Sequence, residues 1–257
     1  MNHLHIHLPY KKLVENIELV RKRRLDLEIY LNADTLDTVT GTDIERLKGY
    51  LDYLPSVTFH APFIDLSPGG VDRLVREVTL KRFLQLIDIA LILRPKAIVF
   101  HPGFNKWRFH GHKDEWLTNS IKTWSIILEK TEPLKCLIAI ENIFEEDPST
   151  LESLVNHIPS GRFGICFDIG HFNIFSKADI MEWVKRLSNQ IKELHLHDNN
   201  GLSDDHLAIG DGNIDFHGFF KMLKETSVNP LLTIEVHTIE AIERSIAKMP
   251  ELLAIIE

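Results

Sequence analysis

Side chains of the types that bind metal ions lie at or just after the ends of successive apolar runs in this 257-residue chain. The runs read SVTFHAP, AIVFHPG, LIAIENI, GICFDIGH, LHLHDN and LLTIEVH. A buried imidazole or carboxylate without a partner is costly, and parallel strands closed into a barrel bring their ends together in one crater. The pattern therefore predicts a site for one to three divalent cations, built from His60, His101, Glu141, Asp168, His171, His195, Asp204, His206 and Glu235.

The last four predicted strands end in three carboxylates and one imidazole: Glu141, Asp168, His195 and Glu235. Such an oxygen-rich set suits Mn²⁺ or Mg²⁺ and tolerates Zn²⁺. For any one of these residues, a hydrogen bond to a neighbouring loop explains the position as well as ligation does. Together they favour a cation, because like charges in register would repel one another without it.

His60 and His101 end the third and fourth predicted strands, and each precedes a proline, in HAP and HPG. Proline keeps the preceding residue extended, so both side chains stay in line with their strands. With Glu141 as a bridge, the two imidazoles could hold a second cation. A satisfied core role for the pair has equal weight.

The third group is His171, Asp204 and His206, in DIGH and in the turn-rich stretch SDDHLAIGDGN. Two imidazoles and a carboxylate match the preferences of Zn²⁺. The alternative, in which His171 contacts substrate and the loop is solvated, has slightly more weight than a permanently occupied third site.

The elements that position these residues alternate along the whole chain. We expect strands near 3–8, 25–31, 56–61, 96–101, 136–142, 163–169, 191–197 and 231–237. We expect helices near 10–23, 42–53, 71–93, 113–130, 148–157, 177–188, 215–225 and 238–255. Strict alternation indicates a parallel sheet, and the count of eight indicates closure. The sequence therefore predicts a single (β/α)8 TIM barrel, with residues 1–257 as one domain.

The period of two in the first strands predicts a polar barrel interior. Helices need the apolar face, so the interior should receive His3, His5, His7, Asp26, Glu28 and Tyr30. His3 is expected to be a hydrogen-bonded interior residue. A substrate in the crater is expected to contact His7, Glu28, Trp107, His171 and His197.

The formal charge of −8 argues weakly against a nonspecific polyanion binder. Cys136 and Cys166 form no CxxC pair and point in opposite directions by strand parity, so they are expected to be buried free thiols in a reducing cytoplasm. No signal peptide and no membrane-spanning run are expected. The predicted location is therefore cytoplasmic, without a membrane partner, and the sequence does not predict an oligomeric state.

The segment GFNKWRFHGHK interleaves Lys106 and Arg108 with aromatic residues that include Trp107. Such a loop can stack on nucleic-acid bases and pair with phosphates. It can equally close over a sugar phosphate.

The set HAP, HPG, IEN, DIGH, HLHDN, DDHLAIGDGNIDF and IEV resembles the xylose-isomerase-like TIM-barrel superfamily, from about Val57 to Glu235. That superfamily includes sugar and sugar-phosphate isomerases and epimerases, and also endonuclease IV, which cleaves DNA at abasic sites. The resemblance to the epimerases implies one cation held by Glu141, Asp168, His195 and Glu235. It also implies that Glu141 and Glu235 move protons and that His171 contacts substrate.

The resemblance to endonuclease IV implies three cations instead. His60 and His101 would hold one, with Glu141 bridging to the next. Asp168, His195 and Glu235 would complete the second site, and His171, Asp204 and His206 would form the third.

The stretches HLHDNNG and DDHLAIGDGNID resemble the isomerase-like members more closely, and Asp205 stands where the nuclease typically has a basic residue. The stretch from Asp198 to Asp205 lacks the arginine that epimerases commonly place there, which puts the substrate class in doubt. We expect a metal-dependent isomerase or epimerase of a small sugar or sugar phosphate, with Zn²⁺ or Mn²⁺. The alternative is a phosphodiesterase that acts at abasic sites in DNA, and a third hypothesis is a non-catalytic sugar-binding barrel.

Overall fold

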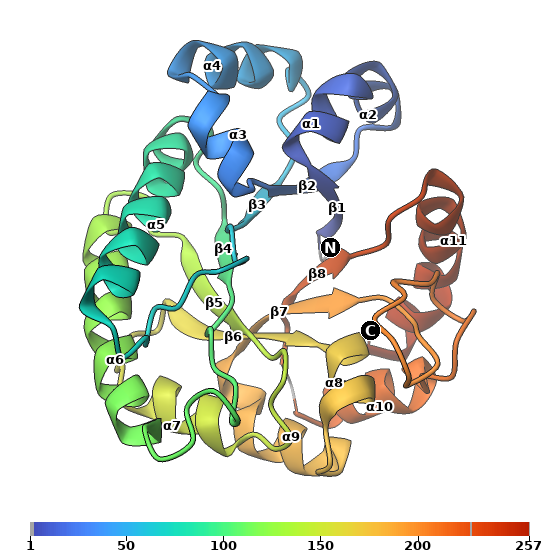
Figure 1. The fold of residues 1–257 in the computed structure, drawn as a ribbon. Coiled ribbons are helices and arrows are strands. Elements are labelled where there is room, and N and C mark those ends of the chain that lie inside the picture. Colours follow the sequence, from blue (N-terminus) through green and yellow to red (C-terminus); the bar gives the residue numbers. More distant parts are fainter. Residues whose placement is uncertain (1–2, 227, 257) are drawn as a thin grey trace.

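The computed structural model describes residues 3–226 and 228–256 and has eight parallel strands in a closed barrel (Figure 1). The strands are β1 (Leu4–Pro9), β2 (Asp26–Tyr30), β3 (Val57–His60), β4 (Ala97–Phe100), β5 (Leu137–Glu141), β6 (Phe163–Asp168), β7 (Ile191–Leu196) and β8 (Leu231–Ile234). Each strand pairs with its neighbour in sequence, and β8 pairs with β1 to close the ring. The predicted (β/α)8 barrel is therefore confirmed.

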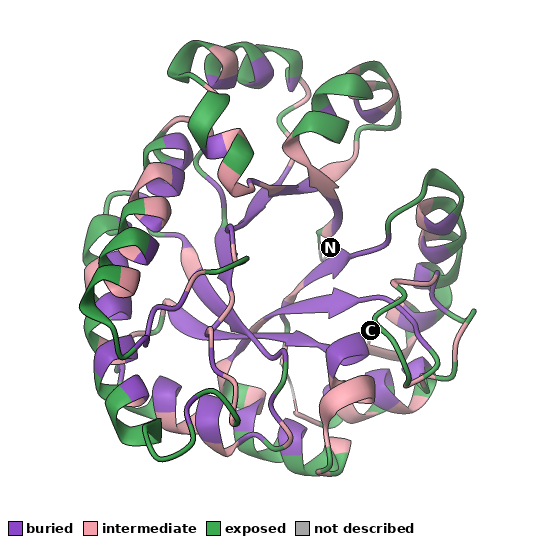
Figure 2. Ribbon diagram, in the orientation of Figure 1, coloured by how far each residue is buried: buried purple, intermediate pink, exposed green. Residues whose placement is uncertain are grey.

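Helices surround the barrel on its outer face (Figure 1). They are α1 (Tyr10–Glu15), α2 (Ile17–Arg23), α3 (Ala33–Thr38), α4 (Gly41–Tyr50), α5 (Arg73–Leu93), α6 (Lys113–Lys130), α7 (Ser149–Asn156), α8 (Ile169–Phe175), α9 (Ile180–Leu187), α10 (Phe216–Thr226) and α11 (Ile239–Ile256). A short 3₁₀ helix, Ser188–Gln190, leads into β7. Figure 2 shows buried residues along the strands and on the barrel-facing sides of the helices.

The expected helices differ from the observed ones at four elements. The predicted helix 10–23 is interrupted at Asn16, and the one predicted from residue 177 begins at Ile180. The sequence prediction missed α3 and α8. Both are short, and a side chain caps each: the Oδ1 of Asn32 accepts from the backbone N–H of Thr35, and a carboxylate oxygen of Asp168 accepts from that of His171.

The interior-facing positions follow the predicted parity, with one correction. His5, His7 and Glu28 are buried, and Cys166 clusters with Val99 and Ala139 inside the barrel. Both cysteines are buried and free, as predicted. His3 is not an interior residue, because its side chain remains 45% exposed at the N-terminal end, where its Nδ1 lies 2.7 Å from Asp26 Oδ2. Among the described residues, no helix has the length and apolarity to cross a bilayer.

Candidate metal centre

A cavity of about 540 Å³ opens at the C-terminal ends of the strands. Two of the predicted ligands, Asp168 and His195, lie fully buried beneath it. The others line it: His60, His101, Glu141, His171, Asp204, His206 and Glu235. The structure therefore brings all of the predicted ligands to one end of the barrel.

The central group joins four strands. One donor atom from each of its members lies within 4.8 Å of the others: Glu141, Asp168, His195 and Glu235. The Nδ1 of His195 lies 2.8 Å from Glu235 Oε2 and 3.4 Å from Glu141 Oε1. Both His195 Nδ1 and Glu235 Oε2 are buried, and although they lie 2.8 Å apart, neither forms a well-aligned hydrogen bond with the other or with another described residue. A buried nitrogen and a buried oxygen that can both coordinate a metal, and that lack a well-aligned hydrogen bond, fit a bound cation.

The second group sits on β3 and β4. The Nε2 atoms of His60 and His101 each lie 3.1 Å from Glu141 Oε2. The Nδ1 of His60 donates to the carbonyl oxygen of Ala61 at 2.9 Å. Glu141 therefore lies between this group and the central one, in the bridging position that the sequence predicted.

The third group gathers residues from α8 and from the loop that follows β7. The Nε2 atoms of His171 and His206 lie 3.3 Å and 3.2 Å from Asp204 Oδ2. His197 has a ring nitrogen within the same cluster. Its ring stacks on that of His206, with centroids 3.9 Å apart. The structure thus adds a fourth residue to the predicted trio.

Fixed acceptors hold the other ring nitrogen of these imidazoles. The Nδ1 of His171 donates to the carbonyl of Asn142 at 3.1 Å, and that of His206 donates to the carbonyl of Glu235 at 2.6 Å. The Nε2 of His195 lies 3.2 Å from Glu28 Oε1, beneath the centre. In the neutral ring, a nitrogen that donates to a carbonyl leaves the opposite nitrogen with a lone pair, and here that opposite nitrogen faces the carboxylates. This is the arrangement in which histidine binds metals.

The charges of the centre are mutually stabilising without a cation. Burial alone would raise the pKa of Glu141, but the charges of His195 and His101 outweigh it and hold that pKa well below its usual range. Burial would likewise lower the pKa of His206, but its hydrogen bond to Asp204 and the charge of Glu235 raise it to about 9. Glu141 is therefore anionic near neutral pH, and the proton on His206 balances the negative charge of Asp204 and Glu235.

Asp168 has two structural roles besides its place among the ligands. It ends β6 and caps α8, and this cap orients the backbone of His171. Its backbone exchanges two hydrogen bonds with the side chain of Asn142, at 2.8 Å and 2.9 Å. Asn142 was not among the residues predicted from the sequence, although it directly follows Glu141.

Asp198 organises the loop that carries Asp204 and His206. Its buried carboxylate accepts four backbone N–H groups, from Asn199, Gly210, Gly212 and Ile214. A Cβ on Gly212 would lie 2.3 Å from Asp198 Oδ1, so this close approach requires glycine. Asp198 was not predicted from the sequence. The glycines of GDGN in the same loop could have indicated a close approach of the backbone to a buried side chain.

The residues predicted to contact substrate do not all lie in the crater. His171 lines the crater, whereas Trp107 is 79% exposed and does not line it. His197 and Glu28 are fully buried, and the Nε2 of His197 lies 3.2 Å from both oxygens of Asp168. His7 is buried, with Nδ1 2.9 Å from Glu28 Oε1 and 3.6 Å from Glu235 Oε1. Their contact with substrate stays a prediction.

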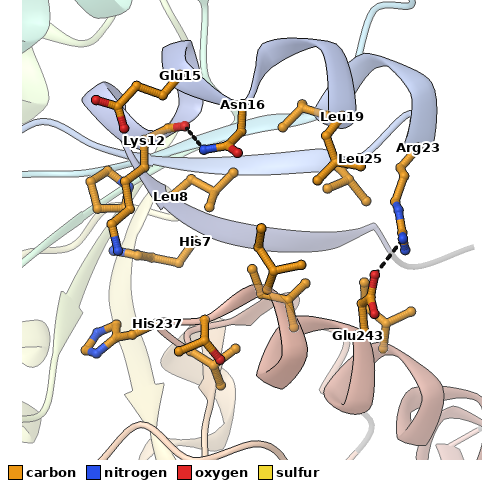
Figure 3. A pocket seen from close by; sticks show the side chains of 17 residues that line it. His7, Leu8, Lys12, Glu15, Asn16, Leu19, Arg23, Leu25, His237 and Glu243 are labelled. Carbon is orange, nitrogen blue, oxygen red and sulfur yellow. Dashed lines mark hydrogen bonds and ion pairs between the residues drawn. The ribbon is translucent and has the colours of Figure 1, made fainter.

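A second cavity, of about 280 Å³, runs along the outside of the barrel between α2 and α11. Figure 3 shows it with His7 and His237 at one end and the ion pair of Arg23 with Glu243 at the other. His237 stacks on His206, with ring centroids 4.2 Å apart. His7 and His237 therefore border this groove while they contact residues of the metal centre.

Comparisons with known proteins agree with this geometry. The family model of the xylose isomerase-like TIM barrel matches residues 22–254. An uncharacterized Methanocaldococcus jannaschii protein is 33% identical over 211 residues, which are 79% of this chain and 72% of that protein. The probable endonuclease 4 of Aquifex aeolicus is 26% identical over 203 residues, 71% of this chain and 69% of the relative. The crystal structure of a D-tagatose 3-epimerase-like protein superposes with a TM-score of 0.84 and 31% identity, covering 100% of this chain and 98% of that one. The chain therefore belongs to the xylose isomerase-like TIM barrel family.

Proposed function

We propose that this protein is a metal-dependent isomerase or epimerase of a small sugar or sugar phosphate. The observation that carries the proposal is the pair Glu141 and Glu235, which come from β5 and the end of β8 and line the same crater. Both belong to the buried group around His195. Two carboxylates in one cavity supply the bases that proton transfer at carbon requires.

The proposed cofactor is Zn²⁺ or Mn²⁺, with one to three ions per chain. The central group, with three carboxylates and one imidazole, suits Mn²⁺, and the imidazole-rich third group suits Zn²⁺. A bound cation supplies positive charge that stabilises the negative charge developing on the substrate oxygens. The unpartnered nitrogen of His195 and oxygen of Glu235 support this assignment.

In the proposed reaction, one of Glu141 and Glu235 removes the proton from the carbon next to the substrate carbonyl. The lowered pKa of each keeps the carboxylate deprotonated, and therefore able to accept a proton, near neutral pH. A proton from water in the open crater, passed on through the other glutamate, is returned to the opposite face or to the neighbouring carbon, and the first glutamate releases its proton to water. Each such transfer is worth roughly 10²–10⁴-fold in rate.

The surrounding residues orient this pair and the substrate. His171 lines the crater and is proposed to contact a substrate hydroxyl. Because Glu28 and His197 have no exposed surface, we propose that they act through His195 and Asp168. His7 would act in the same way on Glu235.

The experiment is a panel of ketoses and aldoses, with and without phosphate, incubated with metal-loaded protein and followed by NMR. We expect interconversion of at least one pair, and a loss of at least about 10²-fold in rate for Glu235→Gln. The matched control is Glu129→Gln on the exposed surface of α6, which should leave the rate unchanged. A panel without any turnover, with metal bound, would contradict the proposal.

A second candidate is an endonuclease IV-like phosphodiesterase acting at abasic sites in DNA. Two observations support this candidate: the side chains of all three ligand groups lie close together, and the chain is similar to the probable endonuclease 4 of Aquifex aeolicus. Against it, Arg108 is the single lysine or arginine among the described residues that lines the crater, and Lys106 pairs with Glu146. Cleavage of an abasic duplex, abolished by His60→Ala with His101→Ala, would favour this candidate.

A further inference from the structure

The outer part of the crater is aromatic. Phe63, Phe104 and Phe144 follow β3, β4 and β5, and Phe175 ends α8. This apolar wall begins directly at the metal ligands on two sides. The ring of Phe63 stacks on His101 with centroids 4.1 Å apart, and the ring of Phe175 lies 6.4 Å from that of His171.

Phe144 extends the wall outward from Phe175. The two rings meet edge to face, with centroids 5.1 Å apart. Phe144 is 47% exposed, a large apolar surface to leave in contact with water at the mouth of a site.

Few polar side chains accompany this wall. Outside the ligand groups, the crater is bordered by Asp65, Asn105 and Arg108. The Oδ1 of Asn105 already accepts the backbone N–H groups of Trp107 and Arg108. Asp65 and Arg108 are exposed and stand at the solvent edge. The aromatic wall therefore offers almost nothing that could replace the water around a row of hydroxyl groups.

The aromatic composition of the wall favours substrates with an apolar group over substrates with several hydroxyl groups. A hydroxyl that leaves water for an aromatic surface loses hydrogen bonds that the wall does not return. An apolar group gains from the same transfer. A hydrophobic pocket discriminates against an added hydroxyl by about 10²-fold.

We propose that the substrate is a sugar or other hydroxy-carbonyl compound joined to an aromatic or alkyl group, which lies against Phe63, Phe144 and Phe175 in place of a free polyhydroxylated tail. The inference rests on the proposed function, because it takes the ligand groups as the end that holds the reacting carbonyl and hydroxyl. It narrows the substrate class from free sugars to their apolar derivatives.

The test uses three hydroxamates, which chelate a cation with the same two oxygens and differ in their tails. Acetohydroxamate has a methyl group, phenylacetohydroxamate a benzyl group and threonohydroxamate a polyhydroxylated chain. Their affinities for zinc-loaded protein are measured by calorimetry. We expect phenylacetohydroxamate to bind at least about 10-fold tighter than acetohydroxamate, and threonohydroxamate to bind no tighter than acetohydroxamate.

Variants test whether the aromatic wall causes the preference for the benzyl group. Phe144→Ala, with Phe144→Leu as the milder form, should reduce the gain from the benzyl group and leave acetohydroxamate binding unchanged. The matched control is Tyr50→Ala, which removes a 42% exposed aromatic ring from α4, away from the crater. Thermal melts check that each variant is folded.

Threonohydroxamate binding as tightly as phenylacetohydroxamate would overturn the inference and leave the proposed function standing. A benzyl preference that survives in both Phe144 variants would overturn it as well. If zinc-loaded protein bound none of the three compounds, a cation open to ligands in the crater would be contradicted, and the inference would fall with the proposed function.

Discussion

At the scale of single residues, the structure explains why Glu28 lies beneath a metal centre without reaching the crater. Its carboxylate lies within hydrogen-bonding distance of both His195 and His7 and has no exposed surface. A carboxylate behind an imidazole fixes the ring and makes the nitrogen that faces the metal more basic. Glu28 is therefore a positioning residue for His195.

We expect Glu28→Gln to bind metal about 10–100-fold more weakly, because the amide orients His195 without the carboxylate charge. A titration against a metal-buffering chelator measures the affinity. Glu129→Gln is the matched control. An unchanged affinity in Glu28→Gln would show that His195 does not depend on this partner.

The protonation of His206 predicts how metal uptake depends on pH. Its pKa is raised to about 9 in the folded protein, from 6.5 in the unfolded chain. The stability that this proton contributes is fully present below pH 6.5 and is lost as the pH rises through about 9. A cation needs the neutral ring, so metal binding at pH 7.5 must release this proton, and affinity must rise with pH.

Calorimetry in two buffers of different ionisation enthalpy counts the released protons. We expect release at pH 7.5 to exceed release near pH 10, where His206 is already neutral. Uptake that releases the same number of protons at both values would mean that His206 is not a ligand.

At the scale of elements, strand ends were predictable because each ligand follows an apolar run whose parity and length define a buried strand. His60, Glu141 and Asp168 are the last residues of β3, β5 and β6. The short helix α8 was not predictable in this way. It depends on the Asp168 cap and on contacts with β7, such as that of Gly170 with His197, which no local periodicity encodes.

The tight packing of α8 on β7 gives a stability prediction. A Cβ on Gly170 would lie 2.0 Å from the ring of His197, so Gly170→Ala must displace one of them. We expect a loss of about 1–3 kcal/mol in the free energy of unfolding, measured in urea. Gly49→Ala on α4, where nothing lies within 4 Å, is the control and should be stabilising by roughly 0.5–1 kcal/mol.

The loop after β7 is the second element whose form the sequence did not predict, because its fold depends on the long-range bonds to Asp198. We expect Asp198→Asn to loosen residues 199–214, because an amide cannot accept four N–H groups as a carboxylate does. Hydrogen exchange should rise across this loop, and metal stoichiometry should fall by the ion that we propose is held at Asp204 and His206. The control is Asp211→Asn, at an exposed residue of the same loop that pairs with Arg244. It should change neither the hydrogen exchange nor the metal stoichiometry.

At the scale of the whole molecule, the closed barrel brings the candidate metal ligands together. Residues as distant in sequence as His60 and Glu235 become neighbours because the closed ring brings all eight strand ends to one mouth. Sequence parity could assign residues to this mouth. It could not assign depth: the structure places Trp107 at the surface and His197 beneath the centre, and their contact with substrate stays a prediction.

The central claim is that this site transfers protons at a carbon atom next to a carbonyl group, with Glu141 and Glu235 as the bases. The direct measurement is deuterium incorporation: metal-loaded protein is incubated with ketoses, free and bearing a phenyl or alkyl group, in D₂O, and the carbon next to the carbonyl is followed by NMR. We expect deuterium at that carbon, dependent on metal and lost in Glu235→Gln. No exchange in any compound by protein that has bound its metal, together with nicking of an abasic DNA duplex, would contradict the account.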